Sequence, residues 1–286
     1  MSSLLPPTWH PALGAVLVAA VVAYAVITSR PGFRVTTAER VRFAGGLVVL
    51  WVACGWPLGD LAAHVSLTAT VLQRLLVMLA AAPLLVASVP VAVVAWCTRP
   101  PAIDRVARAV SHPAVAILVV TVLGTMTLVP SVVTWGSSSS AAGALVVAVT
   151  LFVGVVLWLP VLGRAPATRR LSDVAKGAYC MAASLVVTSL SFVWIFSRHV
   201  LYPSFSHQHA IVAMSPIVDQ QLAGYVSKFG AYLPLWTVAF VYFARSGDRG
   251  EDDGGTLRWV DVQRELERAD RRAREGGAAV PDVPTD

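Results

Sequence analysis

Two basic side chains lie inside apolar stretches that are long enough to cross a lipid bilayer. Arg74 lies seven residues into the run that begins at Leu67, and Lys228 lies nine residues after Asp219. A charged side chain inside an apolar span is costly unless it reaches water or a partner, so each of the two indicates a functional site. Side chains on a helix tilt toward its N-terminus, which directs both cations toward the same side of the bilayer.

This placement leaves two interpretations open. In the first, both cations reach back to the lipid headgroups, as long basic side chains commonly do. In the second, a buried polar network lies near the outer surface and is made up of Arg74, Lys228, Asp219, Gln220 and Asp60. Asp219 and Gln220 also open a helix, where its dipole stabilises a carboxylate. Because the sequence contains no phosphate-binding glycine loop, activated nucleophile or paired intramembrane carboxylates, we expect no enzyme.

A candidate metal site lies in the loop that precedes the last apolar segment. This loop holds His199, His207 and His209, and Met214 follows shortly after. Imidazole and thioether groups are suitable copper ligands, so copper is a candidate cofactor here. The alternative, which we favour, is that these four residues are grouped in the loop by chance.

The elements that must position these residues are membrane helices. Only 13% of the 286 residues are charged and 56% are hydrophobic, whereas a soluble domain has about 25% charged residues. About 20 apolar residues cross the hydrocarbon core, and seven apolar segments occur at 11–29, 43–58, 67–89, 113–130, 141–162, 175–196 and 220–244. They predict an all-α, polytopic membrane protein with seven transmembrane helices. In the third segment, Pro83 predicts a kink and Pro90 predicts the end of the helix.

The basic residues predict how the chain is oriented. Arginine-rich stretches follow the first, third and fifth segments, whereas the loops after the second, fourth and sixth contain only Arg198 besides histidines. Because basic loops stay in the cytoplasm, the N-terminus is expected outside and the C-terminus inside. The arginines therefore serve topology, and no nucleic-acid partner is expected.

The chain divides into a seven-span membrane domain, residues 1–245, and a cytoplasmic tail, residues 246–286. In the tail, residues 246–255 are rich in glycine and acid and are typical of a linker. A short amphipathic helix is then predicted from the spacing of Val262, Leu266, Ala269 and Ala273, and a disordered end follows.

Three stretches resemble the CtaG family of cytochrome c oxidase assembly factors, which serve caa-type oxidases. They are PLGDLAAHVSLTATVLQRLLVMLAAAPLLVASVP at 57–90, LWLPVLG at 157–163 and DQQLAGYVSK at 219–228. The resemblance covers roughly residues 10–245. It implies a multi-pass plasma-membrane protein in contact with the lipid bilayer, which matures the oxidase and handles copper. Its implied partners are oxidase subunits or a copper chaperone.

The chain departs from this family where the resemblance would place histidines. Thr70, Arg74 and Leu128 occupy those positions, and the histidine pair that opens the fifth segment is missing. The resemblance therefore implies a divergent member without the intramembrane copper ligands, in which Arg74 places a fixed positive charge where a metal would carry one. The alternative function is a transporter with an outward-facing polar pocket around Arg74, Lys228 and Asp219, although the paired repeats with broken helices expected of transporters are not evident.

The predicted orientation can be tested with reporter fusions. Fusions after Arg105 and Arg169 should be cytoplasmic, because both follow arginine-rich stretches, and fusions near Ser138 and Gln208 should be external. Reporter activity on each side of the membrane is the measurement. A cytoplasmic signal at Gln208 would contradict the seven-span arrangement.

Overall fold

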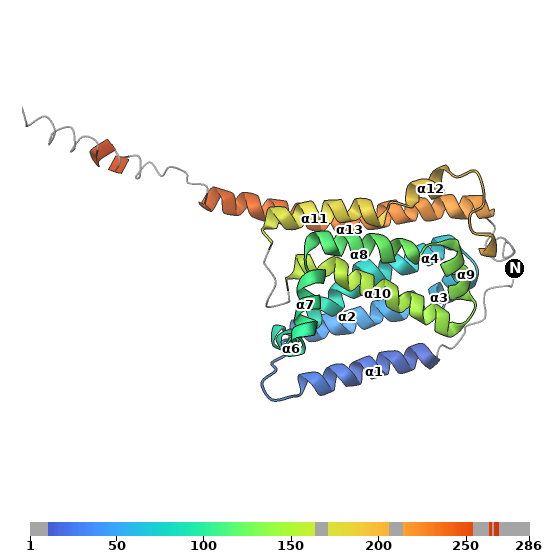
Figure 1. The fold of residues 1–286 in the computed structure, drawn as a ribbon, viewed down its shortest axis with the longest axis horizontal. Coiled ribbons are helices and arrows are strands. Elements are labelled where there is room, and N and C mark those ends of the chain that lie inside the picture. The colour runs from blue at the N-terminus through green and yellow to red at the C-terminus, as the bar shows by residue number, and fades with distance from the viewer. Residues whose placement is uncertain (1–10, 164–170, 206–213, 254–262, 265, 269–286) are drawn as a thin grey trace, which may run out of the picture.

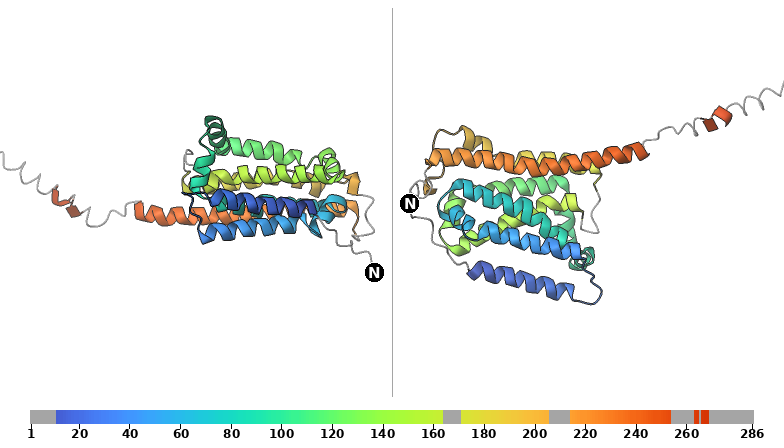
Figure 2. Two further views of the ribbon diagram at one scale, coloured as in Figure 1. Left: turned by 90° about the horizontal axis from the view of Figure 1, so that it is seen from below. Right: turned by 180° about the vertical axis from the view of Figure 1, so that it is seen from behind.

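The computed structural model describes residues 11–163, 171–205, 214–253, 263–264 and 266–268. Within these ranges the regular elements are all helical and no strand occurs, which confirms the all-α fold class. The helices form one bundle, with α1 (Pro11–Thr28) along one edge and the pair α11 (Asp173–Val187) and α13 (Pro216–Asp253) along the opposite edge (Figure 1). Figure 2 shows the same arrangement from below and from behind.

The first two apolar segments form α1, which has no buried residue, and α2 (Thr37–Cys54). A capping box begins α2: the Thr36 hydroxyl accepts from the Glu39 amide at 3.2 Å, and the Glu39 carboxylate accepts from the Thr36 amide at 3.0 Å. These reciprocal bonds satisfy donors that the first helical turn leaves free. The second segment ends earlier than expected, because the chain turns by 45° after Cys54 into the short helix α3 (Leu58–His64).

The third segment forms a continuous helix of 22 residues, Leu67–Ser88, whose middle turns are widened. It consists of α4 (Leu67–Leu75), the π-helix η1 (Leu76–Ala81) and α5 (Ala82–Ser88). The π-helical turns lie directly before Pro83, whose ring crowds the preceding turn and which has no N–H to donate. The irregularity expected at Pro83 is therefore a widened stretch of helix, and the helix ends two residues before Pro90.

Besides α3, three short helices are not predicted by the sequence analysis: α6 (Val91–Cys97), α7 (Pro101–Val110) and α9 (Pro130–Ser137). Both α7 and α9 begin with proline, which is favourable at the first helical position because its missing N–H would have no partner there. Helix α7 lies at 82° to α8 (Pro113–Met126) and buries none of its residues. The stretch expected to be an arginine-rich loop is therefore largely a helix across one end of the bundle.

The second half of the chain contains α10 (Ser140–Leu162), α11, α12 (Ser191–Phe196), the short 3₁₀-helix η2 (Pro203–Phe205) and α13. With 38 residues, α13 extends well past the bundle (Figures 1 and 2), so residues 246–253 are helical rather than a linker. In the tail, residues 263–264 and 266–268 are helical and Leu266 is exposed. Val262, Ala269, Ala273 and the predicted disordered end lie outside the described residues.

Four helices of the described chain are long and apolar enough to cross a membrane: α1, the helix 67–88, α10 and the stretch 173–196. The bent pairs α2 with α3 and α7 with α8 raise the number to six if each pair is one span. Helix α13 is not among them, because it is less apolar along its length. The count of seven spans and the orientation of the termini therefore remain predictions.

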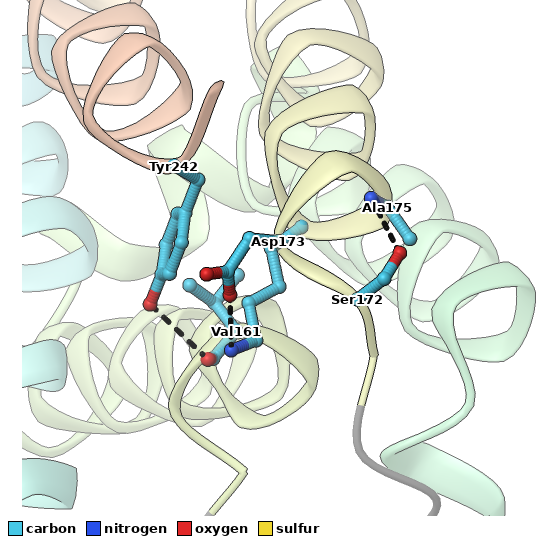
Figure 3. A network of polar contacts seen from close by, with 6 residues as sticks. Val161, Ser172, Asp173, Ala175 and Tyr242 are labelled. Carbon is cyan, nitrogen blue, oxygen red and sulfur yellow. Dashed lines mark hydrogen bonds and ion pairs between the residues drawn. The ribbon is translucent and has the colours of Figure 1, made fainter. Parts of the chain in front are cut away.

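At the end where α11 begins, a polar cluster ties this helix to α10 and α13 (Figure 3). Lys176 pairs with Asp173 at 3.2 Å, and its ammonium nitrogen lies 4.8 Å from the centre of the Tyr242 ring. The Tyr242 hydroxyl donates to the carbonyl of Val161 at 3.5 Å. The three helices are thus joined at this end by polar contacts as well as by packing.

The widened helix that contains Arg74 touches α10 closely at Gly154. A Cβ atom at Gly154 would lie 2.7 Å from the Cβ of Ala82 and 2.9 Å from both the Cα and the carbonyl oxygen of Met78. One turn later, Trp158 donates from Nε1 to this same carbonyl at 3.1 Å. Small residues permit such close approach between membrane helices. Gly154 and Trp158 therefore fix the π-helical turns against the centre of the bundle.

Replacing Gly154 by Ala should lower the stability of the protein by about 1–3 kcal/mol, because the new methyl group overlaps backbone atoms. This loss should exceed the gain of up to about 1 kcal/mol that alanine brings to a helix. Thermal unfolding of the purified protein in detergent is the measurement. Gly14→Ala in α1 is the matched control, since its Cβ would have nothing within 4 Å. Equal Tm values for the two variants would contradict the close contact.

Candidate functional site

The carboxylate of Asp219, in the first turn of α13, holds the N-terminus of α4. Its Oδ2 accepts from the amide of Leu67 at 2.7 Å, and its Oδ1 accepts from the Ser66 hydroxyl at 2.6 Å and the Thr68 amide at 3.3 Å. The Thr68 hydroxyl donates in return to the backbone carbonyl of Asp219 at 2.9 Å. A negative charge is favourable here because it satisfies free amides and faces the positive end of the helix dipole.

The neighbouring Gln220 holds the segment after α12 against α13. Its side chain is almost completely buried, with 2% of its surface exposed. The amide oxygen accepts from the Leu201 amide at 2.8 Å, and the amide nitrogen donates to the carbonyl of His199 at 3.2 Å. Both ends of the Gln220 amide are therefore hydrogen-bonded. These bonds fix the backbone at His199 and Leu201, and with it the position of the next residue, Tyr202.

Tyr202 is buried in the bundle and links this segment to the end of α8. Its hydroxyl donates to the carbonyl of Leu128, just past the end of α8, and its ring lies edge to face against Trp194 with the centres 6.1 Å apart. Burial raises the pKa of Tyr202, whereas the positive charge of Arg74 acts in the opposite direction. Tyr202 is therefore neutral at physiological pH and lies within the electrostatic reach of Arg74.

Arg74 of α4 is buried near α8 and Tyr202, with 9% of its surface exposed. Its Nη2 would lie 3.0 Å from a Cβ atom on Gly124, so the end of the side chain reaches the surface of α8. The Nε atom is covered and has no hydrogen-bond partner. Arg74 makes no hydrogen bond or ion pair with the residues that the structure describes. Its burial favours a role inside the bundle over contact with lipid headgroups.

Lys228 takes no part in these contacts. The ammonium group of Lys228 lies 3.6 Å from the centre of the Phe192 ring and 5.0 Å from that of Tyr232, so aromatic faces stabilise it. Asp60 is partly buried in the first turn of α3. Within the described chain, neither Arg74 nor Lys228 forms an ion pair with Asp219. Asp219 and Gln220 are thus adjacent anchors, while the two cations lie in separate surroundings.

The structure describes only part of the predicted copper site. His199 is exposed, and its carbonyl accepts from Gln220 and from the Ser197 hydroxyl. Met214 is partly buried, whereas His207 and His209 lie outside the described residues. Within the described ranges, no group of three or more His, Cys, Asp or Glu side chains is arranged to hold a metal ion.

The positions at which the resemblance places histidines also lack metal ligands. The Thr70 hydroxyl donates to the carbonyls of Ala62 at 2.7 Å and Ser66 at 3.0 Å, which is a structural role. Leu128 is buried, and its carbonyl is occupied by Tyr202. A guanidinium carries only donors and stays protonated, so Arg74 cannot serve as a ligand. These residues do not fit an intramembrane copper site.

The sequence analysis misses the partners of Asp219 and the neighbours of Arg74. Ser66 could have been found, because a serine directly before a long apolar run is typical of a helix N-cap. Its hydroxyl indeed accepts from the Ala69 amide at 3.2 Å. Tyr202 and Gly124 give no comparable signal, because their importance depends on which helices pack together.

Fold and contacts together define an all-helical protein with several potential membrane spans and a set of polar anchors at one end of the bundle. The chain matches the family of cytochrome c oxidase caa3 assembly factors (Caa3_CtaG) over residues 16–247, and it belongs to this family. No curated protein and no solved structure matches the chain. The family confirms the resemblance seen in the sequence, supports a role in assembly and suggests that this role is non-catalytic.

The anchoring role of Asp219 can be measured by a double-mutant cycle. Asp219→Ala should destabilise the protein by about 1–3 kcal/mol, because donors at the start of α4 lose their acceptor. Asp219→Ala and Ser66→Ala should be coupled by at least about 0.5 kcal/mol, since they remove two sides of one hydrogen bond. Thermal unfolding in detergent gives these values.

A matched cycle between Asp219 and Arg74 is the control. The structure shows no contact between the two side chains, so Asp219→Ala and Arg74→Gln should add within about 0.5 kcal/mol. Strong coupling in this second cycle would reveal an ion pair between Arg74 and Asp219 and would contradict the assignment of Asp219 to α4.

Proposed function

We propose that this protein is an assembly factor for caa3-type cytochrome c oxidase that acts in the plasma membrane, in contact with the lipid bilayer. The observation that carries the proposal is the family match over residues 16–247, which covers the helical bundle from within α1 to beyond residue 245. Oxidase subunits are the partners that this role requires, and a copper chaperone is a further candidate. The absence of a predicted catalytic group agrees with a protein that guides assembly.

The proposed topology has seven spans, with the N-terminus outside and the C-terminus in the cytoplasm. In support, the connection after α1, the whole of α7 and the start of α11 lie at the end of the bundle from which α13 extends, whereas α3, α9 and α12 lie at the other end (Figure 1). Arginine and lysine are concentrated at the first of these ends. Basic segments remain on the cytoplasmic side, and α13 then provides the seventh span.

The proposed assembly role does not use an intramembrane copper site. Thr70, Arg74 and Leu128 offer no suitable ligand, and Arg74 adds a positive charge that disfavours a nearby metal cation. Copper handling by this chain would depend on the loop with His199 and Met214, for which the described residues supply only two candidate ligands. We therefore favour contacts with oxidase subunits or a copper chaperone, rather than copper binding by this chain itself, as the basis of its role in assembly.

The transporter alternative requires Arg74, Lys228 and Asp219 to line one pocket. In the structure, the Asp219 carboxylate is occupied by the start of α4, and the Lys228 ammonium lies against Phe192 and Tyr232. No contact among the described residues brings the three charged groups together. We therefore favour assembly over transport.

Deletion of the gene should lower the amount of assembled caa3-type oxidase while transcription of its subunits stays unchanged. Haem spectra of membranes and oxygen uptake are the measurements, and complementation with the intact chain is the control. Because the intramembrane ligands are missing, added copper should not restore the oxidase. Normal spectra and oxygen uptake in the deletion strain, at every copper level, would overturn the proposal.

A further inference from the structure

Arg74 carries a positive charge for which the described residues provide no counter-charge. Its side chain is nine-tenths buried, its Nε has no partner, and the described chain offers it no hydrogen bond or ion pair. Asp219, which belongs to α13 and caps the N-terminus of α4, already accepts from three donors there. An uncompensated buried charge is strongly destabilising, so the native protein needs a compensating negative group beside Arg74.

The groups around the guanidinium cannot supply this compensation. Val153 lines the same space as Gly124, since it lies 3.7 Å from the position of a Cβ on that glycine. The Tyr202 hydroxyl donates to the carbonyl of Leu128 and is neutral, so it carries no negative charge that could compensate Arg74. The unmet requirement at Arg74 is therefore for an acceptor that carries a negative charge.

We propose that Arg74 binds a small monovalent inorganic anion of the halide class, such as chloride, between α4 and α8. The glycine at position 124 fits this role, because any side chain there would lie within about 3 Å of Nη2 and would compete with an ion for the guanidinium. A charge-assisted contact of this kind is stronger than a neutral hydrogen bond. The bound ion would neutralise Arg74 and hold the two helices together.

The surroundings of Arg74 favour a small ion over larger ligands. Because only 9% of the Arg74 surface is exposed, a carboxylate on another protein could reach it only if the helices around it separated. A multivalent anion would require a second cation, and Lys228 is instead held against the Phe192 ring at 3.6 Å. The inference concerns this one side chain and does not depend on the role in oxidase assembly.

The test uses the purified full-length chain in detergent, with the sodium salt of chloride, bromide, acetate, formate or gluconate at constant ionic strength. Chloride and bromide should raise the Tm in a saturable way, because an ion that binds only the folded state stabilises it. Equilibrium binding of radioactive chloride should show one ion per chain. Arg74→Gln should weaken this binding at least about tenfold, as expected from the loss of a hydrogen bond to a charged group.

Two further variants separate binding from folding. Lys228→Gln is the matched control: it removes the other cation of the apolar segments and should keep the full response to chloride. Gly124→Ala retains the charge of Arg74 but places a methyl group 3.0 Å from the position of Nη2 in the structure, so it should weaken chloride binding while the protein still folds. This variant keeps the test decisive if Arg74→Gln does not fold.

Three outcomes would overturn the inference. The first is the absence of saturable chloride binding to the wild-type chain. The second is an equal chloride response in the wild type, Arg74→Gln and Gly124→Ala, which would show general salt stabilisation. The third is a response to acetate and formate but not to halides, which would indicate a site for a carboxylate.

Discussion

The bond between Asp219 and the N-terminus of α4 is the contact on which the arrangement of the site depends. It joins residues that are about 150 positions apart in the chain, and it does so with a carboxylate that accepts from Ser66, Leu67 and Thr68 at once. Asp219 also lies in the first turn of its own helix, so two helix N-termini face one negative charge. Because both dipoles favour this charge, a buried ionised group becomes stabilising here.

Once the start of α4 is fixed, the depth of Arg74 follows. The seven residues between Leu67 and Arg74 correspond to about 10 Å along a helix, which carries the guanidinium away from the polar end and into the apolar part of the bundle. Directly after Arg74 the helix widens into η1, and Trp158 holds the Met78 carbonyl there. The cation thus lies between two fixed points, the cap at Asp219 and the anchored π-helical turns, and has little freedom to move toward a headgroup.

The sequence was sufficient to predict the helical class and the positions of most apolar segments, because hydropathy is a local property. It also predicted the end of the helix near Pro90, whereas the kink expected at Pro83 is in fact a stretch of π-helix at Leu76–Ala81. It did not predict α7, whose arginines made it look like a loop, or the continuation of α13 through Asp253. The capping partner of Asp219 was missed for another reason: it depends on packing between distant helices, which no local pattern records.

The contrast between Asp219 and Arg74 explains why the polar residues do not behave as one group. Asp219 is buried with all the partners that a carboxylate needs, and Lys228 uses the faces of Phe192 and Tyr232. Arg74 alone among these three charged groups lacks a described partner, although it is the most strongly directed donor. Caps and aromatic contacts suffice to explain Asp219 and Lys228 as parts of the fold. Arg74 is instead the group for which we propose a bound anion, and this proposal distinguishes it from the two structural charges.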